Sequence, residues 1–235
     1  MSKIYLNFPI SMIPPIYVSI YDGFNDIIDY GIYKYTKRRG LTLEEAAEEM
    51  GIILRQKDIK HYEDIFSREA DCNVFTAIGK VPAFKYRDSG KNMEQDRDEI
   101  LAVACALAVR SIIGVKEYAL CHKRLVLSRM SGIAKAVDAE LYNDAIKPLV
   151  EEGQRRQWRK AIQSLSHYGC SVYVPQGCHG FYASYRLKPI QLATKVEGML
   201  ARNRGVVNEY HLSNEQLRKI ALKKIASPLK DKCPP

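Results

Sequence analysis

The spacing of apolar residues predicts a mainly α-helical chain that is interrupted by one short β-hairpin. Apolar side chains recur every three to four residues, the period of an amphipathic helix, in segments 23–40, 41–52, 96–114, 121–132, 138–152, 154–169, 188–205 and 213–226. Segment 96–114 is apolar nearly all round, which is typical of a central core helix. Residues 1–20 are apolar and broken by prolines, so we expect an extended arm or a short strand there.

Glycines and capping residues support several of these boundaries. Gly40 follows three basic residues and Gly114 follows the core helix, as expected at helix C-termini. Thr42 followed by Glu45 is the signature of a capping box. Residues 53–93 carry mixed signals, which predict a helix at 61–70 and then turns with one strand.

The hydrophobic period changes in "CSVYVPQGCHGFYASY", residues 170–185. β-branched and aromatic residues on both sides of a Pro-Gln-Gly sequence predict strands near 170–174 and 180–185, joined by a turn. We expect the hairpin to be held to the core by Val172, Val174 and Phe181, with Tyr173 or Tyr185 as a further contact. Cys170 and Cys178 are then small apolar side chains in or near the hairpin.

Charge is unevenly distributed along the 235 residues. The net charge is +9, with an acidic first half, and residues 154–204 contain nine basic residues and a single acidic one, Glu197. A basic surface of this kind suits a phosphate backbone, although it is also compatible with an ordinary lysine-rich face. The sequence contains no run of about 18 apolar residues, so we expect no membrane-spanning helix. The N-terminal residues make a poor signal peptide, and we therefore expect a cytoplasmic protein.

The predicted helix at 154–169 has two different sides. Trp158, Ile162 and Leu165 form an apolar stripe that can dock on a core. The remaining surface carries the residues that we expect to face DNA, namely Arg155, Arg156, Gln157, Arg159, Lys160 and Gln163. Arginine, lysine and glutamine suit phosphates and base edges in a major groove.

A basic helix, a glycine and a hairpin follow one another in "RRQWRKAIQSLSHYGCSVYVPQGCHGFYAS", and this stretch resembles the recognition helix and wing of winged helix-turn-helix domains from phages and mobile elements. The matching positions are Leu165, Gly169, Val172, Gly180, Phe181, Tyr182 and Ala183. The resemblance covers roughly residues 97–205. It implies that the basic helix enters the duplex and that Gln176, His179 and Arg186 are wing contacts.

The sequence departs from this pattern between residues 132 and 153. A compact helix-turn-helix has a turn of three or four residues, whereas this segment is much longer. The predicted helix at 138–152 is therefore either an insertion or the positioning helix itself.

Other chemistries find less support in the sequence. Cys170, Cys178, His179 and His167 lack the paired spacing of a zinc site, and neighbouring residues of a strand face opposite sides. Cys121 and His122 diverge on a helix, and no phosphate-binding loop, metalloprotease helix or serine elbow is present. We therefore expect no enzyme, no metal and no cofactor.

Together these patterns predict a winged-helix-like basic region at 94–210, after a mostly helical acidic region at 1–93 and before a C-terminal helix and tail at 211–235. The expected function is binding of double-stranded DNA, either sequence-specific or general. The resemblance implies a phage or mobile-element setting and a role in regulation or replication control. The alternative is a protein-interaction or assembly module that uses a winged helix without DNA, with the N-terminal region contributing the interface.

Overall fold

The computed structural model describes residues 5–51, 74–89, 96–150, 155–203, 218–219 and 221–222. They belong to two compact units. The first unit comprises Met1–Gly114 and Arg124–Ser164, and the second comprises Val115–Lys123 and Leu165–Pro235. The predicted helix at 61–70 and most of the predicted helix at 213–226 lie outside the described residues.

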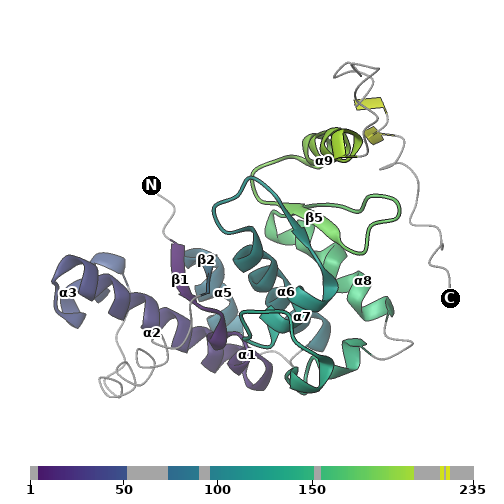
Figure 1. Cartoon of the computed structure of the whole chain (residues 1–235). Helices are drawn as coiled ribbons and strands as arrows, with labels where there is room; N and C mark the ends of the chain where they lie inside the picture. The colour runs from purple at the N-terminus through teal and green to yellow at the C-terminus, as the bar shows by residue number, and fades with distance from the viewer. Residues whose placement is uncertain are drawn as a thin grey trace. The chain divides into compact units, whose positions relative to one another are not determined.

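The first unit is mainly helical and carries a β-ribbon (Figure 1). Its helices are α1 (Pro15–Val18), α2 (Ile20–Arg39), α3 (Leu43–Met50), α5 (Lys80–Ser89), α6 (Arg97–Ile113), α7 (Lys123–Met130, in this unit from Arg124 on) and α8 (Arg155–Ser164). The strands β1 (Tyr5–Pro9) and β2 (Phe75–Gly79) pair antiparallel, with Tyr5 opposite Gly79 and Pro9 opposite Phe75. Short 3₁₀ turns occupy Ile10–Met12, Ala139–Leu141 and Lys147–Val150.

Helix α6 is the core of this unit, as its apolar composition predicts. Every residue from Ile100 to Val109 is buried. Helices α1 and α8 and strand β2 pack against it, and the Thr76 hydroxyl of β2 donates to the carbonyl of Leu107 at 2.6 Å. α6 therefore fixes the position of α8 within the unit.

Two predicted helix boundaries are confirmed in the first unit. α2 ends at Gly40, whose φ is +67°, and α3 begins at Thr42 with a complete capping box. The Thr42 hydroxyl accepts from the Glu45 amide at 3.2 Å, and the Glu45 carboxylate accepts from the Thr42 amide at 2.8 Å.

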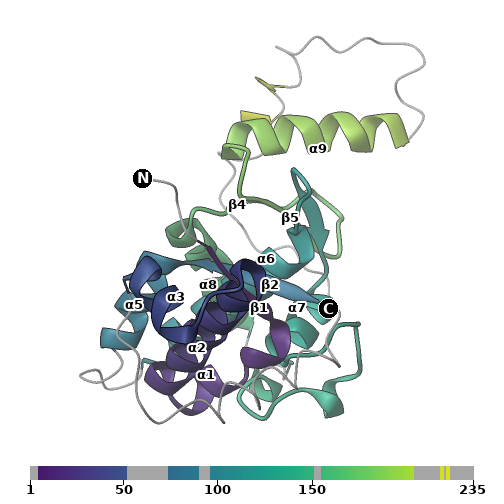
Figure 2. The same cartoon turned by 90° about the vertical axis from the view of Figure 1, so that its left-hand side faces the viewer.

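The second unit contains a small antiparallel sheet covered by a helix (Figure 2). Strands β3 (Ala119–Cys121), β5 (Phe181–Ser184) and β4 (Ser171–Tyr173) lie in that order, and α9 (Pro189–Asn203) packs on β4 and β5. A 3₁₀ turn at Leu165–Tyr168 precedes the sheet. The predicted hairpin and the predicted helix from Pro189 are both confirmed, and so is the mainly helical fold with a small antiparallel hairpin.

The predicted α-helix at 138–152 is wrong. Its described part, up to residue 150, is a loop with two short 3₁₀ turns. The hydroxyls of Ser128 and Ser131 accept from the amides of Val137 and Asn143, and the Asn143 side chain accepts from Ala145. The amides of Asn143 and Ala145 thus bond to side chains instead of the carbonyls of a helix, and Pro148 has no N–H to offer.

Residues 1–20 were expected to form an extended arm or a short strand; Tyr5–Pro9 is a strand, but Pro15–Val18 forms the helix α1. Strand β3 and helix α5 were also not predicted from the sequence. β3 is a three-residue strand whose partner, β5, lies about sixty residues further along the chain. α5 occupies 80–89, where Gly79 and Pro82 indicated turns; Pro82 lies in the first turn of the helix, where proline is tolerated.

Candidate nucleic-acid interface

Helix α8 has a buried side that faces α6 and an exposed side that carries its charge. Ala161 is buried, and Trp158 and Ile162 are half-buried. Arg156, Arg159, Lys160 and Gln163 are all exposed. The apolar residues of α8 therefore face the core of the first unit and its basic residues face solvent, as the helical period of the sequence predicts.

Two further predicted contact residues on α8 are placed differently. The side chain of Arg155 lies outside the described part of the structure. Gln157 is half-buried, and its Oε1 atom is buried without a hydrogen-bond partner among the described residues. The Gln157 carbonyl oxygen thus faces the interior of the unit rather than the solvent.

Lys160 has an acidic neighbour within the same unit. Its Nζ atom lies 2.8 Å from Oδ2 of Asp98, which is in the first turn of α6, and both side chains are about half exposed. An ion pair this exposed contributes at most about 1 kcal/mol, because water screens both charges. This weak pairing leaves the Lys160 ammonium accessible to a phosphate.

The tip of the hairpin is a tight turn built on Gly177. The Cys178 amide donates to the Pro175 carbonyl at 3.3 Å, and Gly177 occupies the third position of this turn with φ of +74°. That conformation is ordinary for glycine and strained for other residues. The side chain of Gln176 is exposed at this tip.

His179 and Gly180, which lie between the turn and β5, are both in close contact with the end of β3. The His179 carbonyl lies 3.1 Å from Nδ1 of His122; a carbonyl can only accept, so this nitrogen carries the proton. A Cβ atom at Gly180 would come within 2.8 Å of the Cys121 carbonyl oxygen, so this position requires glycine. The His179 side chain itself is exposed.

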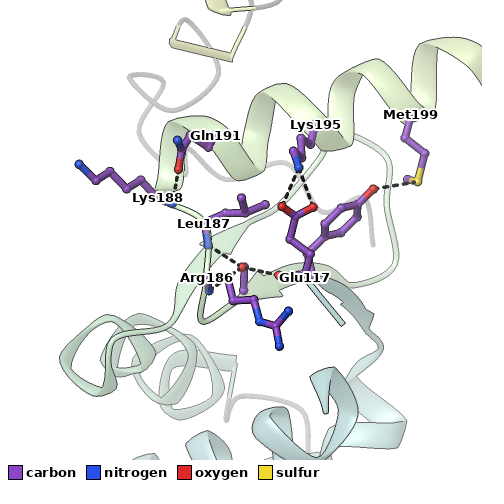
Figure 3. A network of polar contacts seen from close by, with 9 residues as sticks. Glu117, Arg186, Leu187, Lys188, Gln191, Lys195 and Met199 are labelled. Atoms are coloured by element: carbon purple, nitrogen blue, oxygen red, sulfur yellow. Dashed lines mark hydrogen bonds and ion pairs between the residues drawn. The ribbon is translucent and has the colours of Figure 1, made fainter. Parts of the chain in front are cut away.

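Arg186 lies just beyond the end of β5, and the buried hydroxyl of Ser184 fixes its backbone (Figure 3). The Ser184 hydroxyl donates to the Glu117 carbonyl at 2.6 Å and accepts from the amides of Arg186 and Leu187 at 3.1 and 2.9 Å. Ser184 is fully buried, whereas the Arg186 side chain is exposed and extends away from α9. The backbone of Arg186 is thus fixed while its guanidinium stays accessible.

Helix α9 is tied to the sheet by polar contacts at several points along its length (Figure 3). The Lys195 ammonium lies 2.7 and 2.6 Å from the two carboxylate oxygens of Glu117, and the Tyr118 hydroxyl lies 3.9 Å from the Met199 sulfur. The Tyr173 hydroxyl of β4 donates to the Glu197 carboxylate. Burial and this carboxylate both raise the pKa of Tyr173 well above its usual value, so it stays protonated as the donor.

An apolar cluster beneath these contacts completes the support of the hairpin. Tyr173, Tyr182, Leu192, Ala193 and Val196 are buried together. Phe181 and Cys170 are also buried, and Cys178 packs against the cluster, as predicted. Val174 is 46% exposed, so the prediction that it packs on the core is wrong.

The structure separates residues that are close in the sequence. The nine basic residues of 154–204 are divided between the units, with those of α8 in the first and Arg186, Lys188, Lys195, Arg202 and Arg204 in the second. Within the second unit, His179 precedes β5 and Arg186 follows it, so these predicted contacts lie at opposite ends of that strand. The predicted contacts are therefore divided between the two units, with those of α8 in the first and those of the hairpin in the second.

Sequence reasoning missed the residues that position Arg186. Glu117 lies 67 residues from Ser184 and 78 from Lys195. No local period or motif connects positions so far apart, and only the pairing of β3 with β5 brings Glu117 to this place.

The described cysteines include Cys121, whose surroundings determine the reactivity of its thiol. Cys121 is fully buried, and burial, followed by the neighbouring Cys170, raises the pKa of its thiol to about 12. It is therefore a protonated thiol at neutral pH rather than a nucleophile. Among the described residues, no group of three or more histidine, cysteine or acidic side chains is arranged to hold a metal ion.

Comparisons with protein-family models, with curated proteins and with solved structures find no match to this chain. Within the described part of the chain, no helix combines the length and the apolarity needed to cross a membrane.

Proposed function

We propose that this chain is a cytoplasmic protein that binds double-stranded DNA, with α8 as the helix that enters the major groove. The observation that carries the proposal is the exposed, basic side of α8, on which Arg156, Arg159 and Lys160 stand while the opposite side is buried against α6. A helix fits the major groove, and arginine is the side chain most often used there to read guanine.

The hairpin of the second unit supports the proposal as a separate contact surface. Gln176, His179 and Arg186 are exposed, while the strands that flank them are anchored by the buried cluster and by the Ser184 hydroxyl. Rigid backbone with accessible polar and cationic tips suits contacts to phosphates, which position a protein on a duplex.

The setting is proposed from the resemblance to winged helix-turn-helix domains of phages and mobile elements. A protein of that type acts in gene regulation or in the control of replication. Whether recognition is sequence-specific depends on base contacts from α8, for which Arg156, Arg159 and Gln163 are the exposed candidates.

A duplex-binding assay at low salt tests this function. We expect the full chain to bind a random duplex, and replacement of Arg155, Arg156, Arg159 and Lys160 by alanine to abolish binding with an unchanged circular dichroism spectrum. Unchanged binding by this folded variant would contradict the role of α8. No binding by the wild-type chain at micromolar concentration would favour the protein-interaction alternative.

A further inference from the structure

The β1–β2 ribbon of the first unit has one face that packs into the core and a second face that carries exposed side chains, although Pro9 on this second face is buried. Leu6, Phe8 and Thr76 point into the unit and are buried. The register places Tyr5 opposite Gly79 and Pro9 opposite Phe75, so Tyr5, Asn7 and Phe75 share the other face. Tyr5 is 45% exposed and Phe75 is 37% exposed, so both rings present surface to solvent.

Each of these exposed rings has a cation against it. The Lys34 ammonium, from α2, lies 4.3 Å from the centroid of the Phe75 ring. The Arg110 guanidinium, from the end of α6, lies 5.1 Å from the centroid of the Tyr5 ring. A ring and a cation placed together at both ends of one exposed face form a surface for a ligand that is both aromatic and anionic.

The positive charge continues along the C-terminal half of α2. Lys34, Lys37 and Arg38 are spaced at i, i+3 and i+4 and therefore share one side of the helix, and residues 30–39 contain no acidic residue. Lys37 and Arg38 are exposed. Lys34, next to Phe75, Lys37 and Arg38 thus form a row of cations along α2 that can contact successive phosphates.

We propose that this face binds single-stranded nucleic acid, with bases stacked on Tyr5 and Phe75 and phosphates near Lys34, Arg110, Lys37 and Arg38. Stacking on an aromatic ring requires an open base face, which a duplex keeps covered by its neighbouring pairs. The ligand is therefore single-stranded, and the surface is distinct from the basic side of α8.

The spacing of the two rings sets the length of strand that can use both. Tyr5 and Phe75 are four residues apart along the ribbon, which is about 14 Å at about 3.4 Å per residue. That is about four times the rise of about 3.4 Å between stacked bases of one strand, so the two rings hold bases that are not neighbours. Asn7, exposed between them, is placed to contact the intervening nucleotides.

Fluorescence anisotropy with the full chain and labelled 12-nucleotide oligo-dT and oligo-U tests this site. We expect the Y5L/F75L variant to bind at least about tenfold more weakly than wild type, because stacking on each ring strengthens binding severalfold or more. The variant Y5F/F75Y keeps both rings and should bind like wild type. Duplex binding should be equal in all three proteins, which separates this site from the one on α8.

Several outcomes would overturn the proposal. They are absence of oligonucleotide binding by the wild type, equal binding by the leucine and ring-retaining variants, or equal losses in both. The ratio of the oligo-dT and oligo-U affinities assigns the site to DNA or to RNA.

The salt dependence gives a second test that leaves the ribbon intact. Replacing Lys37 and Arg38 by alanine should reduce the slope of log affinity against log salt by about 1.4, because each phosphate contact on a single strand contributes about 0.7. The control K135A/K147A removes two exposed cations from elsewhere in the first unit and should keep the wild-type slope. Equal slopes in the two double variants would contradict the assignment of these cations to phosphates.

Discussion

At the tip of the hairpin, one glycine decides whether the turn can form. Gly177 has φ of +74°, and no other atom lies within 4 Å of the position that a Cβ would take. Space is therefore available for a side chain, and the restriction at this position comes from the backbone conformation alone. The tip that presents Gln176 and His179 depends on this conformation.

Substitution of Gly177 separates backbone conformation from crowding. We expect Gly177→Ala to lower the free energy of unfolding of the second unit by about 1–2 kcal/mol, since a left-handed conformation costs an L-residue that much. Gly177→Asn should recover most of the loss, because asparagine tolerates this region. Urea unfolding measures both, and equal stability of the alanine variant and wild type would contradict the assigned turn.

The buried thiol of Cys121 makes stability depend on alkaline pH. Its pKa is raised to about 12 in the folded protein, so above the usual thiol pKa the unfolded chain loses a proton that the folded chain keeps. The free energy of unfolding should therefore fall by about 1.4 kcal/mol per pH unit from this group between its unfolded and folded pKa values. Stability below the unfolded pKa is unaffected.

Comparison with Cys121→Ala isolates this contribution from that of the buried tyrosines. The variant should lose less stability than wild type when the pH is raised from 8 to 10.5, as measured by urea unfolding. A variant whose stability falls as steeply as that of wild type would show that Cys121 is not the titrating group.

At the scale of elements, α9 is held to the sheet by a polar contact as well as by apolar packing. The hydrogen bond from Tyr173 to Glu197 joins β4 to the middle of α9 and is partly buried. Its loss leaves the Glu197 carboxylate without this donor, and a bond to a charged group contributes about 1.5–3 kcal/mol.

The conservative variant Tyr173→Phe tests this contact. We expect it to lower the free energy of unfolding by about 1–3 kcal/mol. It should also increase amide hydrogen exchange in α9 and β4 before other parts of the second unit. Removing both partners in Y173F/E197Q should cost less than the sum of the two single variants; additive losses would contradict a direct interaction.

The elements that the sequence predicts well are those with a local signal. Helix α6 is continuously apolar, and α8 has one apolar and one basic side. In the hairpin, the helical spacing of apolar residues gives way to β-branched and aromatic residues on both sides of a Pro-Gln-Gly turn. β3 has three residues and is defined by pairing with Ala183 and its neighbours, which no local pattern announces. The loop at 138–150 has a helical period of apolar residues, but the amides of Asn143 and Ala145 donate to serine and asparagine side chains instead of continuing a helix.

The candidate site shows the same division between local and distant information. The exposed side of α8 follows from its period, whereas the anchoring of Arg186 through Ser184 and Glu117 does not. The predicted strand at 170–174 places Val172 and Val174 on the same face, which we expected to hold the hairpin to the core, but Val174 is 46% exposed. α9 covers the side that carries Tyr173, and an apolar pattern on both faces cannot indicate which one a helix will cover.

At the scale of the whole molecule, the basic residues of segment 154–204 are divided between two units. The cations of α8 belong to the first unit, and those that follow the hairpin belong to the second. Full-length variants with substitutions in only one unit can therefore measure how much the cations of that unit contribute to DNA binding. The proposed role of α8 is the central one, because its exposed basic side is the observation on which the function depends.

The salt dependence of duplex binding tests that role most directly, with R156A/R159A compared against K85A/K135A, which removes two exposed cations of the first unit outside α8 and the 3₁₀ turn that packs on it. We expect R156A/R159A to bind more weakly and to reduce the slope of log affinity against log salt by about 1.8, because each phosphate contact on a duplex contributes about 0.9. The control pair should keep the wild-type slope. Equal slopes and affinities for the two variants would contradict duplex binding through α8.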